Sequence, residues 1–473
     1  MQESKFLEKI LKIGRKIIPK SIFKAAQPIY HYILAITGAI IYRLPARKLI
    51  VIGVTGTKGK TTTVELVNSI LEQAGYQTAL ASTLRYKIRG KEWRNLFKMT
   101  LRGRFFTQRF LSQAVDKGCT HAIIEISSEG VPQFRHKFLF LDALIFTNLA
   151  PEHIESHGSY ANYVKAKLAI AKELEGREGK SRKKVWPTST GSMEEIRGLF
   201  GETFQRGPVI VVNADDKEGE KFLALNIKNK IPYSLHDAIA VKANEKGSYF
   251  QIGKLVIHSK LPGIFNVSNM LGAIAYAKFA GVSEENIKKG LEEINFIRGR
   301  MEKIDCGQEF DVVVDYAHTP DSLKAVYETY NSCKKIAVLG NTGGGRDKWK
   351  REEMGKIADK YCDQIILTNE DPYDEDPNKI VEDIKKGIKP AFVKTSAGEE
   401  KPKVEVIMDR RTAIRTAIQN ALTLKQTQGD KYKMAVLITG KGTDPYIMGS
   451  NGTKQEWDDA TVAREELKKA LKN

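Results

Sequence analysis

Hydrophobic residues fall along this chain in short blocks, separated by polar turns and by stretches with helical spacing. Residues 48–54 read KLIVIGV and carry no charge after the first lysine, as expected for a strand buried on both faces of a parallel sheet. From Thr61 the apolar side chains recur at helical spacing, and Gly75 ends the pattern. Comparable apolar runs occupy residues 77–83, 120–127, 141–149 and 208–216. The pattern therefore predicts an α/β fold with a parallel-rich sheet.

The C-terminal part of the chain repeats this alternation of strands and helices. Its apolar runs occupy residues 312–318, 335–341, 363–369 and 434–440. Such an alternation is typical of a doubly wound, Rossmann-like domain. With 473 residues, the chain is also too long for one ordinary core. We expect three parts, which are a short helical N-terminal segment (1–47), a nucleotide-binding central domain (48–297) and a Rossmann-like C-terminal domain (298–473).

The turn after the first strand has the features of a phosphate-binding loop. It reads TGTKGKTTT (55–63), and a helix starts directly after its second glycine. The unpaired N–H groups and the positive dipole end of that helix point at whatever the turn holds. Lys60 adds a positive charge, and the Thr61 hydroxyl is suited to Mg²⁺. Such turns also arise by chance, and the strict motif has a glycine in place of Val54, so the prediction rests on the strand–turn–helix context.

Other polar residues follow the next buried strands. Glu125 lies near the end of the run at 120–127, Asn148 near the end of the run at 141–149, and His153 comes soon after. Ligands of open α/β sheets bind at the carboxyl ends of the strands. A lone glutamate or histidine there is more often a solvated or capping group. Together with a phosphate turn, however, these residues suggest Mg²⁺ coordination.

The N-terminal segment is basic and then uncharged. Residues 1–24 carry seven lysine or arginine residues, and their apolar side chains predict an amphipathic helix that ends at Pro19. Residues 25–42 carry no formal charge, but their proline, glycine and polar residues make a poor membrane span. No cleavage site of a secretory signal follows. Three alternatives stay open: packing against the central domain, peripheral membrane contact through residues 1–44, and a true span.

Composition and charge narrow the choice of partners and compartment. The chain has 41% hydrophobic and 28% charged residues, as globular proteins do. Its four cysteines lie far apart in the sequence, so neither a zinc knuckle nor a disulfide framework is indicated, and a reducing cytosol fits best. The formal net charge of +19 favours anionic partners. Because no nucleic-acid-binding motif accompanies this charge, we expect no nucleic acid partner.

Several motifs taken together resemble the Mur ligase family. They are TGTKGKTT (55–62), EISSEG (125–130), TNLAPEHIESHGSYANYVKAK (147–167) and DYAHTPD (315–321). The resemblance covers about residues 48–470 and is strongest to the ligases that add the third amino acid to UDP-N-acetylmuramoyl-dipeptide. It implies an ATP-dependent, ADP-forming enzyme of peptidoglycan synthesis that joins an amino acid to a carboxylate through an acyl phosphate. A Mur-like ligase for a lipid-linked wall precursor, a folylpolyglutamate-synthase-like ligase and a non-catalytic ATP-binding switch stay open as alternatives.

The resemblance also implies which residues form the site. The expected catalytic residues are Lys60, Glu125, His153 and Lys167. The expected ligands of two Mg²⁺ ions are Thr61, Glu125, His153 and Lys167, where Lys167 stands at the family position of a carbamylated lysine. The residues expected to bind ATP are Gly56, Thr57, Lys58, Gly59, Lys60, Thr61, Thr62, Asn148, Asn266, Asn269, Arg300, Asp315 and His318. One departure is Glu129, because the family usually has a histidine after the paired serines.

The expected acceptor site departs from one branch of the family. The residues expected to bind the incoming amino acid are Arg346, Asp371, Pro372, Tyr373, Gly440, Lys441 and Asp444. Diaminopimelate-adding ligases have the motif Asp-Asn-Pro-Arg, whose arginine pairs with the distal carboxylate of the amino acid. This chain has Asp371 and Tyr373 in place of that asparagine and arginine. Acidic residues favour an amine-ended side chain, so lysine or a similar diamino acid is expected rather than diaminopimelate.

The largest departure precedes the phosphate turn. Ligases of this type carry a UDP-sugar-binding domain there, whereas fewer than fifty residues precede the first strand in this chain. We expect that the donor is held differently or is not the usual soluble nucleotide. The expected partners are a small-molecule or lipid-linked wall precursor and an amino acid. The expected location is the cytoplasm, at the inner face of the membrane if the N-terminal segment makes peripheral contact.

Overall fold

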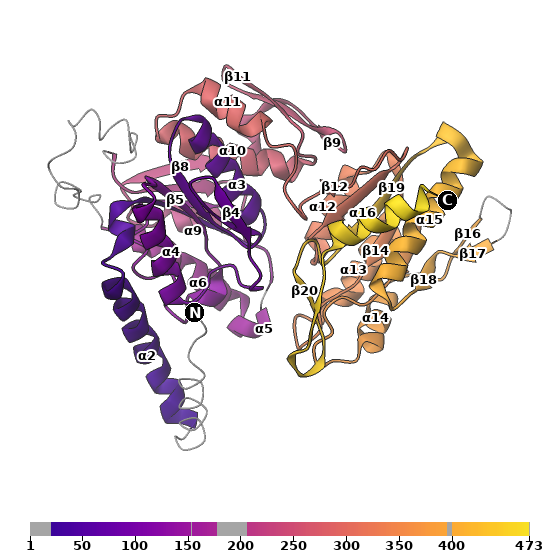
Figure 1. The fold of residues 1–473 in the computed structure, drawn as a ribbon, viewed down its shortest axis with the longest axis horizontal. Helices are drawn as coiled ribbons and strands as arrows, with labels where there is room; N and C mark the ends of the chain where they lie inside the picture. The colour runs from indigo at the N-terminus through magenta and orange to yellow at the C-terminus, as the bar shows by residue number, and fades with distance from the viewer. Residues whose placement is uncertain (1–19, 153, 177–205, 395–399, 473) are drawn as a thin grey trace.

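The computed structural model describes residues 20–152, 154–176, 206–394 and 400–472. Two α/β halves lie side by side, the N-terminal half coloured indigo to pink and the C-terminal half orange to yellow (Figure 1). A sheet lies in the middle of each half, with helices packed on it. The expectation of an α/β protein with parallel-rich sheets is confirmed. The division of the chain at residues 48 and 298 stays a prediction.

The N-terminal half is built on an eight-stranded sheet with the order β4-β3-β2-β5-β1-β6-β7-β8. Its strands are β1 (Ile50–Thr55), β2 (Thr78–Ala81), β3 (Arg85–Ile88), β4 (Lys91–Arg94), β5 (His121–Glu125), β6 (Ala143–Phe146), β7 (Val209–Asn213) and β8 (Asn229–Tyr233). In this spatial order, every neighbouring pair between β2 and β8 is parallel. The pairs β2 with β3 and β3 with β4 are antiparallel. β1 is an inner strand and is buried throughout, which explains why its sequence holds no charge.

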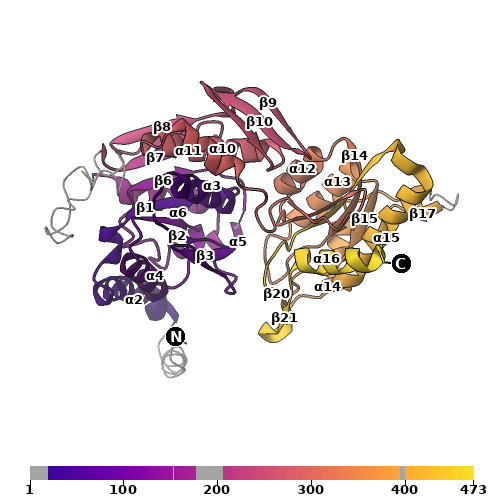
Figure 2. The same cartoon turned by 45° about the horizontal axis from the view of Figure 1, so that its top comes forward.

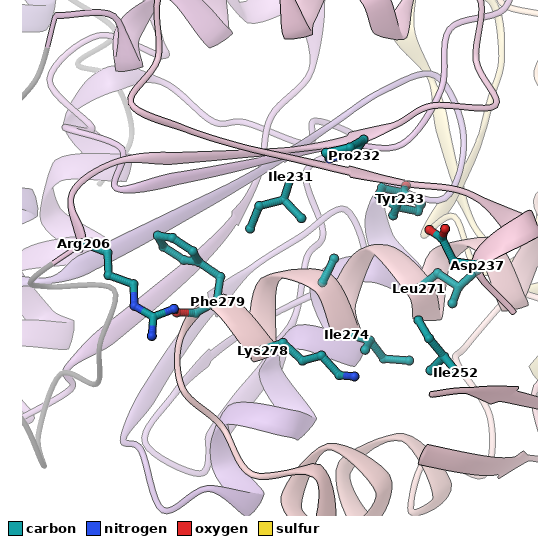
Figure 3. A pocket seen from close by; sticks show the side chains of 11 residues that line it. Arg206, Ile231, Pro232, Tyr233, Asp237, Ile252, Leu271, Ile274, Lys278 and Phe279 are labelled. Carbon is teal, nitrogen blue, oxygen red and sulfur yellow. The ribbon is translucent and has the colours of Figure 1, made fainter. Parts of the chain in front are cut away.

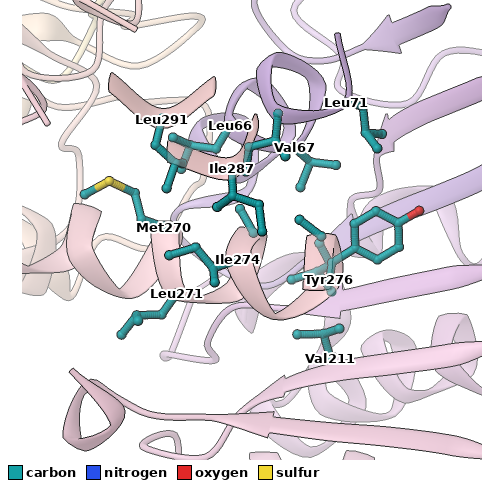
Figure 4. Packing of buried hydrophobic residues seen from close by; sticks show 14 of the residues in the cluster. Leu66, Val67, Leu71, Val211, Met270, Leu271, Ile274, Tyr276, Ile287 and Leu291 are labelled. Carbon is teal, nitrogen blue, oxygen red and sulfur yellow. The ribbon is translucent and has the colours of Figure 1, made fainter. Parts of the chain in front are cut away.

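Helices cover both faces of this sheet and enclose two hydrophobic cores. The helices and 3₁₀ turns of this half are α2 (Lys20–Ile41), η1 (Pro45–Lys48), α3 (Lys60–Gln73), α4 (Arg104–Asp116), η2 (Ser128–Gly130), α5 (Ile154–His157), α6 (Tyr160–Ala171), η3 (Lys172–Leu174), α9 (Gly219–Leu223), η5 (Leu235–Asp237), α10 (Ile264–Phe279) and α11 (Glu284–Glu292). In one core, Val67 of α3 packs with Ile274 of α10 and Ile287 of α11 (Figure 4). Full burial of such a side chain contributes about 1.5–3 kcal/mol, so this core fixes α3 and the turn before it.

A small antiparallel sheet extends the N-terminal half. Its strands are β9 (Ile239–Asn244), β10 (Gly247–Ile252) and β11 (Leu255–Ser259), in the order β11-β10-β9. The turn between β9 and β10 reaches toward the C-terminal half, where the Glu245 carboxylate lies 3.0 Å from the Lys433 ammonium (Figure 2). The apolar runs of the sequence do not predict this sheet, because β9 exposes most of its side chains.

The C-terminal half contains a six-stranded sheet with the order β12-β13-β19-β14-β15-β18. Its strands are β12 (Glu302–Lys303), β13 (Asp311–Asp315), β14 (Cys333–Leu339), β15 (Gln364–Leu367), β18 (Val404–Val406) and β19 (Lys433–Thr439). The other elements are α12 (Pro320–Thr329), α13 (Lys350–Tyr361), α14 (Pro377–Lys385), α15 (Arg410–Gln428), α16 (Asp459–Ala470), η6 (Gly429–Lys431), η7 (Ser450–Gly452) and the hairpins of β16 (Phe392–Lys394) with β17 (Glu400–Pro402) and β20 (Tyr446–Met448) with β21 (Lys454–Glu456). Only β12 runs antiparallel to its neighbour in the large sheet.

The N-terminal helix α2 extends from the body of the protein (Figure 1). It runs from Lys20 past Pro28 to Ile41, and the buried residues Ala35 and Ala39 lie on its face toward α4. The basic helix predicted before Pro19 lies outside the described residues. In the part of the chain that the structure describes, no helix is long and apolar enough to cross a membrane.

A buried histidine supports the loop between η2 and β6. His136 is only 3% exposed, and its Nδ1 atom has no hydrogen-bond partner among the described residues. The pKa of His136 is lowered from its ordinary value of 6.5 to about 4, chiefly by burial, while Glu173 opposes the shift and Lys137 adds to it. The imidazole is therefore neutral in the folded protein at neutral pH.

This histidine predicts a pH dependence of stability. Between pH 6.5 and about 4 the unfolded chain protonates His136 while the folded protein does not, so acidification through this window costs the folded state up to about 3 kcal/mol. Denaturant unfolding measured across this range should show a smaller loss of stability for His136→Gln than for the wild type. His236→Gln, at an exposed position, is the control and should keep the wild-type slope. Identical slopes for the two variants would contradict the assignment.

Candidate active site

The predicted phosphate turn connects β1 to α3. Gly59 is the N-cap of α3 with a φ of 78°, and Lys60 is the first residue of the helix. The Lys60 ammonium donates to the carbonyl oxygen of Thr57 at 2.8 Å, so its side chain folds back over the turn. Burial lowers the pKa of Lys60, and Glu125 and Glu152 only partly oppose this. The turn therefore combines helix N–H groups with a half-buried lysine, as a phosphate site requires.

Side chains from two other elements hold the turn in shape. A Cβ atom at Gly59 would lie 2.1 Å from Oδ1 of Asn269 on α10, and one at Gly56 would lie 2.0 Å from Oγ1 of Thr147 after β6. Asn148 accepts the N–H of Lys58 at 2.9 Å and donates to its carbonyl oxygen at 3.2 Å. Neither glycine tolerates a side chain here, and the predicted residues Asn148 and Asn269 both contact the turn.

A carboxylate and a fully buried lysine flank the turn. Glu125, the last residue of β5, accepts the Thr61 hydroxyl at 3.0 Å and the Thr83 N–H at 2.8 Å. Lys167 of α6 is 1% exposed, and its ammonium donates to the Gly56 carbonyl oxygen at 2.8 Å and approaches the Thr55 hydroxyl at 3.3 Å. Burial lowers the pKa of Lys167 well below its ordinary value, and the nearby Lys60 lowers it further. A neutral amine at this position can act as a nucleophile, as an ammonium cannot.

The structure brings together three of the four predicted Mg²⁺ ligands. Thr61 and Glu125 are in hydrogen-bond contact, and Lys167 reaches the same turn through Gly56. His153 lies outside the described residues. Among the residues that are described, no group of three or more histidine, cysteine, aspartate or glutamate side chains could hold a metal ion. Of the predicted ligand set, the described residues therefore supply a hydroxyl, one carboxylate and the amine of Lys167.

Residues of the C-terminal half reach the same turn. The Arg300 guanidinium lies 3.5 Å from the Thr61 hydroxyl and packs over the Tyr316 ring at 4.6 Å. Asp315 is buried and accepts the N–H groups of Met301 and Ala317 at 2.8 and 2.6 Å. The carboxylate of Asp315 therefore fixes the backbone beside Arg300. The predicted contact of Asp315 with ATP stays a prediction.

A buried glutamate links the two halves. Glu152 lies 3.2 Å from the Lys58 ammonium and 2.7 Å from Nε2 of His318, whose Nδ1 faces the Tyr316 carbonyl oxygen at 2.8 Å. Burial lowers the pKa of His318 to about 4, and Lys58 adds to this shift. A neutral imidazole has one N–H and can donate to only one of these two oxygens. The predicted residues Lys58 and His318 are therefore joined through Glu152.

The predicted acceptor residues gather where parallel strands of the C-terminal sheet end. Asp371 follows β15, and Gly440 and Lys441 follow β19. The Lys441 ammonium lies 2.9 Å from Asp371 and 3.2 Å from Asp444. Lys98, from the segment between β4 and α4, contacts the same two carboxylates at 2.5 and 3.1 Å. Burial alone would raise the pKa of Asp444, but Lys441 and Lys98 together lower it.

The remaining acceptor residues border this cluster. Pro372 follows Asp371, and the N–H of Tyr373 donates to the carbonyl oxygen of Met448 at 3.0 Å. The Arg346 guanidinium lies 5.6 Å from the centre of the Tyr373 ring. Among the nucleotide residues, Thr62 is buried in the first turn of α3, and Asn266 of α10 accepts from Asn269 at 3.3 Å. The structure thus brings the described members of the predicted site to the facing edges of the two sheets.

Two residues that the sequence did not predict complete this arrangement. Glu152 stands beside His153 in the motif, but its role depends on His318, which is 166 positions away. Lys98 lies in a stretch that reads only as basic and polar, and its partner Asp371 is 273 positions away. These pairs could be recognised only in the tertiary structure. Of the two strands that precede Lys98 in the chain, β3 alternates between buried and half-buried residues, whereas β4 is exposed throughout.

A pocket of about 340 Å³ lies apart from the predicted site. Its walls are mostly apolar and come from β8, β10 and α10, with Arg206 and Lys278 at its border (Figure 3). None of its lining residues belongs to the predicted site. It lies along α10 beyond Asn266 and Asn269, so the same helix serves both regions.

Family models match most of the chain. The Mur ligase middle domain matches residues 54–179 and 189–277, and the glutamate ligase domain of Mur ligases matches residues 299–442. The chain belongs to the Mur ligase family. The expected class of enzyme, an ATP-dependent, ADP-forming ligase of peptidoglycan precursors, is thereby confirmed.

Named relatives agree with this assignment. The chain is 31% identical over 453 residues to the UDP-N-acetylmuramoyl-L-alanyl-D-glutamate–2,6-diaminopimelate ligase of Syntrophomonas wolfei. The match covers 93% of this chain and 82% of that protein. The chain is 33% identical to the UDP-N-acetylmuramyl-tripeptide synthetase of a Roseiflexus species, covering 92% of this chain and 81% of the relative. Folylpolyglutamate synthase of Mycobacterium tuberculosis shares the fold, with a TM-score of 0.62, 14% identity and coverage of 88% and 96%.

The contact between Gly59 and Asn269 predicts the effect of a single methyl group. In Gly59→Ala the new Cβ would collide with Asn269 in a backbone conformation that alanine rarely adopts, so we expect ATP affinity to fall about a hundredfold, which corresponds to about 2.7 kcal/mol. Titration calorimetry with ATP measures this. Gly75→Ala is the matched control, since its φ is +85° but nothing lies within 4 Å of the new Cβ. Equal ATP affinities of the two variants would show that Asn269 does not shape the turn.

Proposed function

We propose that this Mur ligase joins a diamino acid to the peptide carboxylate of a muramoyl precursor, using Lys60, Glu125 and Lys167 for ATP and the Asp371–Asp444 pair for the amino acid. One observation carries the proposal. The phosphate turn and the acidic pair lie on the facing sheet edges of the two halves, and Arg300 and Lys98 cross between them. This arrangement lets one half activate a carboxylate while the other presents an amine.

The reaction has two steps with balanced bonds. A carboxylate oxygen of the precursor attacks the γ-phosphorus of ATP, and the bond from that phosphorus to the oxygen of ADP breaks. The amine nitrogen of the amino acid then attacks the acyl carbon of the resulting acyl phosphate, the bond from that carbon to the phosphate oxygen breaks, and the nitrogen loses a proton. Lys60, Arg300 and the helix N–H groups stabilise the charge on the phosphate oxygens.

We propose Mg²⁺ ligands in the same turn. Bound Mg²⁺ would neutralise phosphate charge and orient the transferred group. Thr61 and Glu125 offer oxygens to it, and Lys167 offers one if its neutral amine adds to the carbon of CO₂ and loses a proton, which gives a carbamate. The depressed pKa of Lys167 supports this modification, because only the neutral amine reacts with CO₂. His153 is proposed as a further ligand from the family motif.

The acceptor site favours a second ammonium group. Asp371 and Asp444 are neutralised here by Lys441 and Lys98, so the cluster binds cations in a buried setting. Lys98 comes from the opposite half, and we propose that the side-chain ammonium of lysine or ornithine replaces it. Arg346, at the border of the cluster, is the proposed partner of the α-carboxylate. A carboxylate-ended side chain such as that of diaminopimelate would instead meet two acidic groups.

The donor we propose is a UDP-linked muramoyl-dipeptide, as the names of the relatives suggest, with its lipid-linked counterpart as the second candidate. The cytoplasm is the proposed compartment. A screen of phosphate release from ATP distinguishes the donors when each is crossed with lysine, ornithine, diaminopimelate and glutamate. Release that requires both a donor and an amine supports the proposed reaction, and release with no amine dependence contradicts it.

Lys167 and Lys165 form a matched pair on α6. Lys167 is buried at the turn and Lys165 is exposed, so Lys167→Ala should reduce phosphate release by about 10²–10³-fold while Lys165→Ala stays within about threefold of the wild type. Bicarbonate should stimulate the CO₂-depleted wild type, and a short carboxylic acid should partly restore Lys167→Ala. Full activity of Lys167→Ala would refute the role of Lys167. Failure of the bicarbonate and rescue tests alone would refute only the carbamate.

The acidic pair predicts a defect in amino acid binding. Asp444→Asn removes one charge that faces the proposed ammonium, so the KM for lysine should rise at least about tenfold while the KM for ATP changes little. Asp374→Asn, at an exposed position in the loop of Asp371, is the control. Steady-state kinetics of phosphate release with each amino acid measures this. A wild-type preference for diaminopimelate or glutamate would overturn the proposed acceptor.

A further inference from the structure

Helix α2 is anchored to the body of the protein through its C-terminal half. Its second half packs on α4, where Ala35 and Ala39 are almost fully buried and a Cβ atom at Gly38 would lie 3.7 Å from the backbone of α4. The His31 ring adds a contact to Arg104 at 2.5 Å. Small residues on this face let the two helices approach closely.

The opposite face of α2 presents a stripe of isoleucines. Ile29, Ile33 and Ile40 are 66%, 54% and 62% exposed, and Ile36 between them is half-buried. These four positions have the spacing i, i+4, i+7 and i+11, so they lie on one side of the helix. We call them the isoleucine stripe. A row of apolar side chains exposed along one side of a helix marks a site of interaction with a partner or a membrane.

Aromatic residues lie beside the stripe near the middle of α2. Tyr32 is 44% exposed, and its ring lies 5.7 Å from that of Phe134 and 5.8 Å from that of Phe138. Tyrosine has an apolar ring and a polar hydroxyl, which suits the boundary between water and hydrocarbon. Tyr32 and the isoleucine stripe therefore combine the aromatic and aliphatic side chains that are typical of a membrane interface.

The sequence that contains the stripe is basic. Residues 20–48 contain no aspartate or glutamate, and their basic residues are Lys20, Lys24, Arg43, Arg47 and Lys48. The sequence of residues 1–19 adds five lysines and arginines and only two glutamates. Two copies of α2 packed stripe to stripe would bring like charges together, whereas an anionic bilayer would attract them.

We propose that the isoleucine stripe of α2 lies in the interface of an anionic lipid bilayer and holds this ligase at the membrane surface. The apolar side chains enter the boundary between headgroups and acyl chains, and the basic residues contact the lipid phosphates. In this arrangement α2 lies along the surface of the bilayer, with the isoleucine stripe turned toward the acyl chains. This surface does not overlap the residues proposed for ATP or for the amino acid.

The test is sedimentation of the full chain with vesicles. At low salt the wild type should bind vesicles that contain phosphatidylglycerol and should bind pure phosphatidylcholine vesicles much more weakly, and high salt should weaken the first interaction. Ile33→Glu should lower the partition coefficient at least about tenfold. Ile239→Glu, which changes a 59% exposed isoleucine on β9, is the matched control and should bind as the wild type does.

Two further measurements make the outcome decisive. Phosphate release with a water-soluble donor should be the same for Ile33→Glu and the wild type, which shows that the variant is folded and keeps this test separate from the proposed reaction. Light scattering after gel filtration reports the oligomeric state. If no vesicle is bound at low salt, or if the wild type forms dimers that Ile33→Glu dissociates, the stripe is not a lipid surface and the proposal is wrong.

Discussion

The close packing around the phosphate turn is the constraint on which the rest of the structure depends. Gly59 leaves room for Asn269 of α10, and Gly56 leaves room for Thr147 after β6, so two other elements touch the turn at van der Waals distance. These elements are in turn fixed by the cores on either face of the large sheet. A change in core packing would therefore move the groups that face the phosphates.

Burial of charge is the second constraint. Lys60 and Lys167 lie close together at the turn, and burial lowers the pKa of both. Two cationic side chains held together away from water are costly without an anion, so an anionic ligand stabilises such a site. In the same way Glu152 is held by Lys58 from its own half and faces His318 from the other half.

The strand–turn–helix at residues 50–73 and four of the six strands of the C-terminal sheet could be predicted because their signals are local. A buried parallel strand has no polar positions, and a turn with Gly59 before Lys60 and Thr61 has few other uses. The hairpin of β3 and β4 and the small sheet of β9 to β11 were not predictable in this way. Their strands are short and partly exposed, so their sequences carry little hydrophobic periodicity.

The sequence by itself determined the family, the fold class and the residues that gather at the turn, because each is encoded in a short contiguous motif. Tertiary structure alone decided that Lys98 meets Asp371, that Glu152 meets His318 and that one face of α2 is left open. The physical reason is sequence separation. Contacts between residues more than a hundred positions apart depend on how whole sheets and helices pack, and no local pattern records that packing.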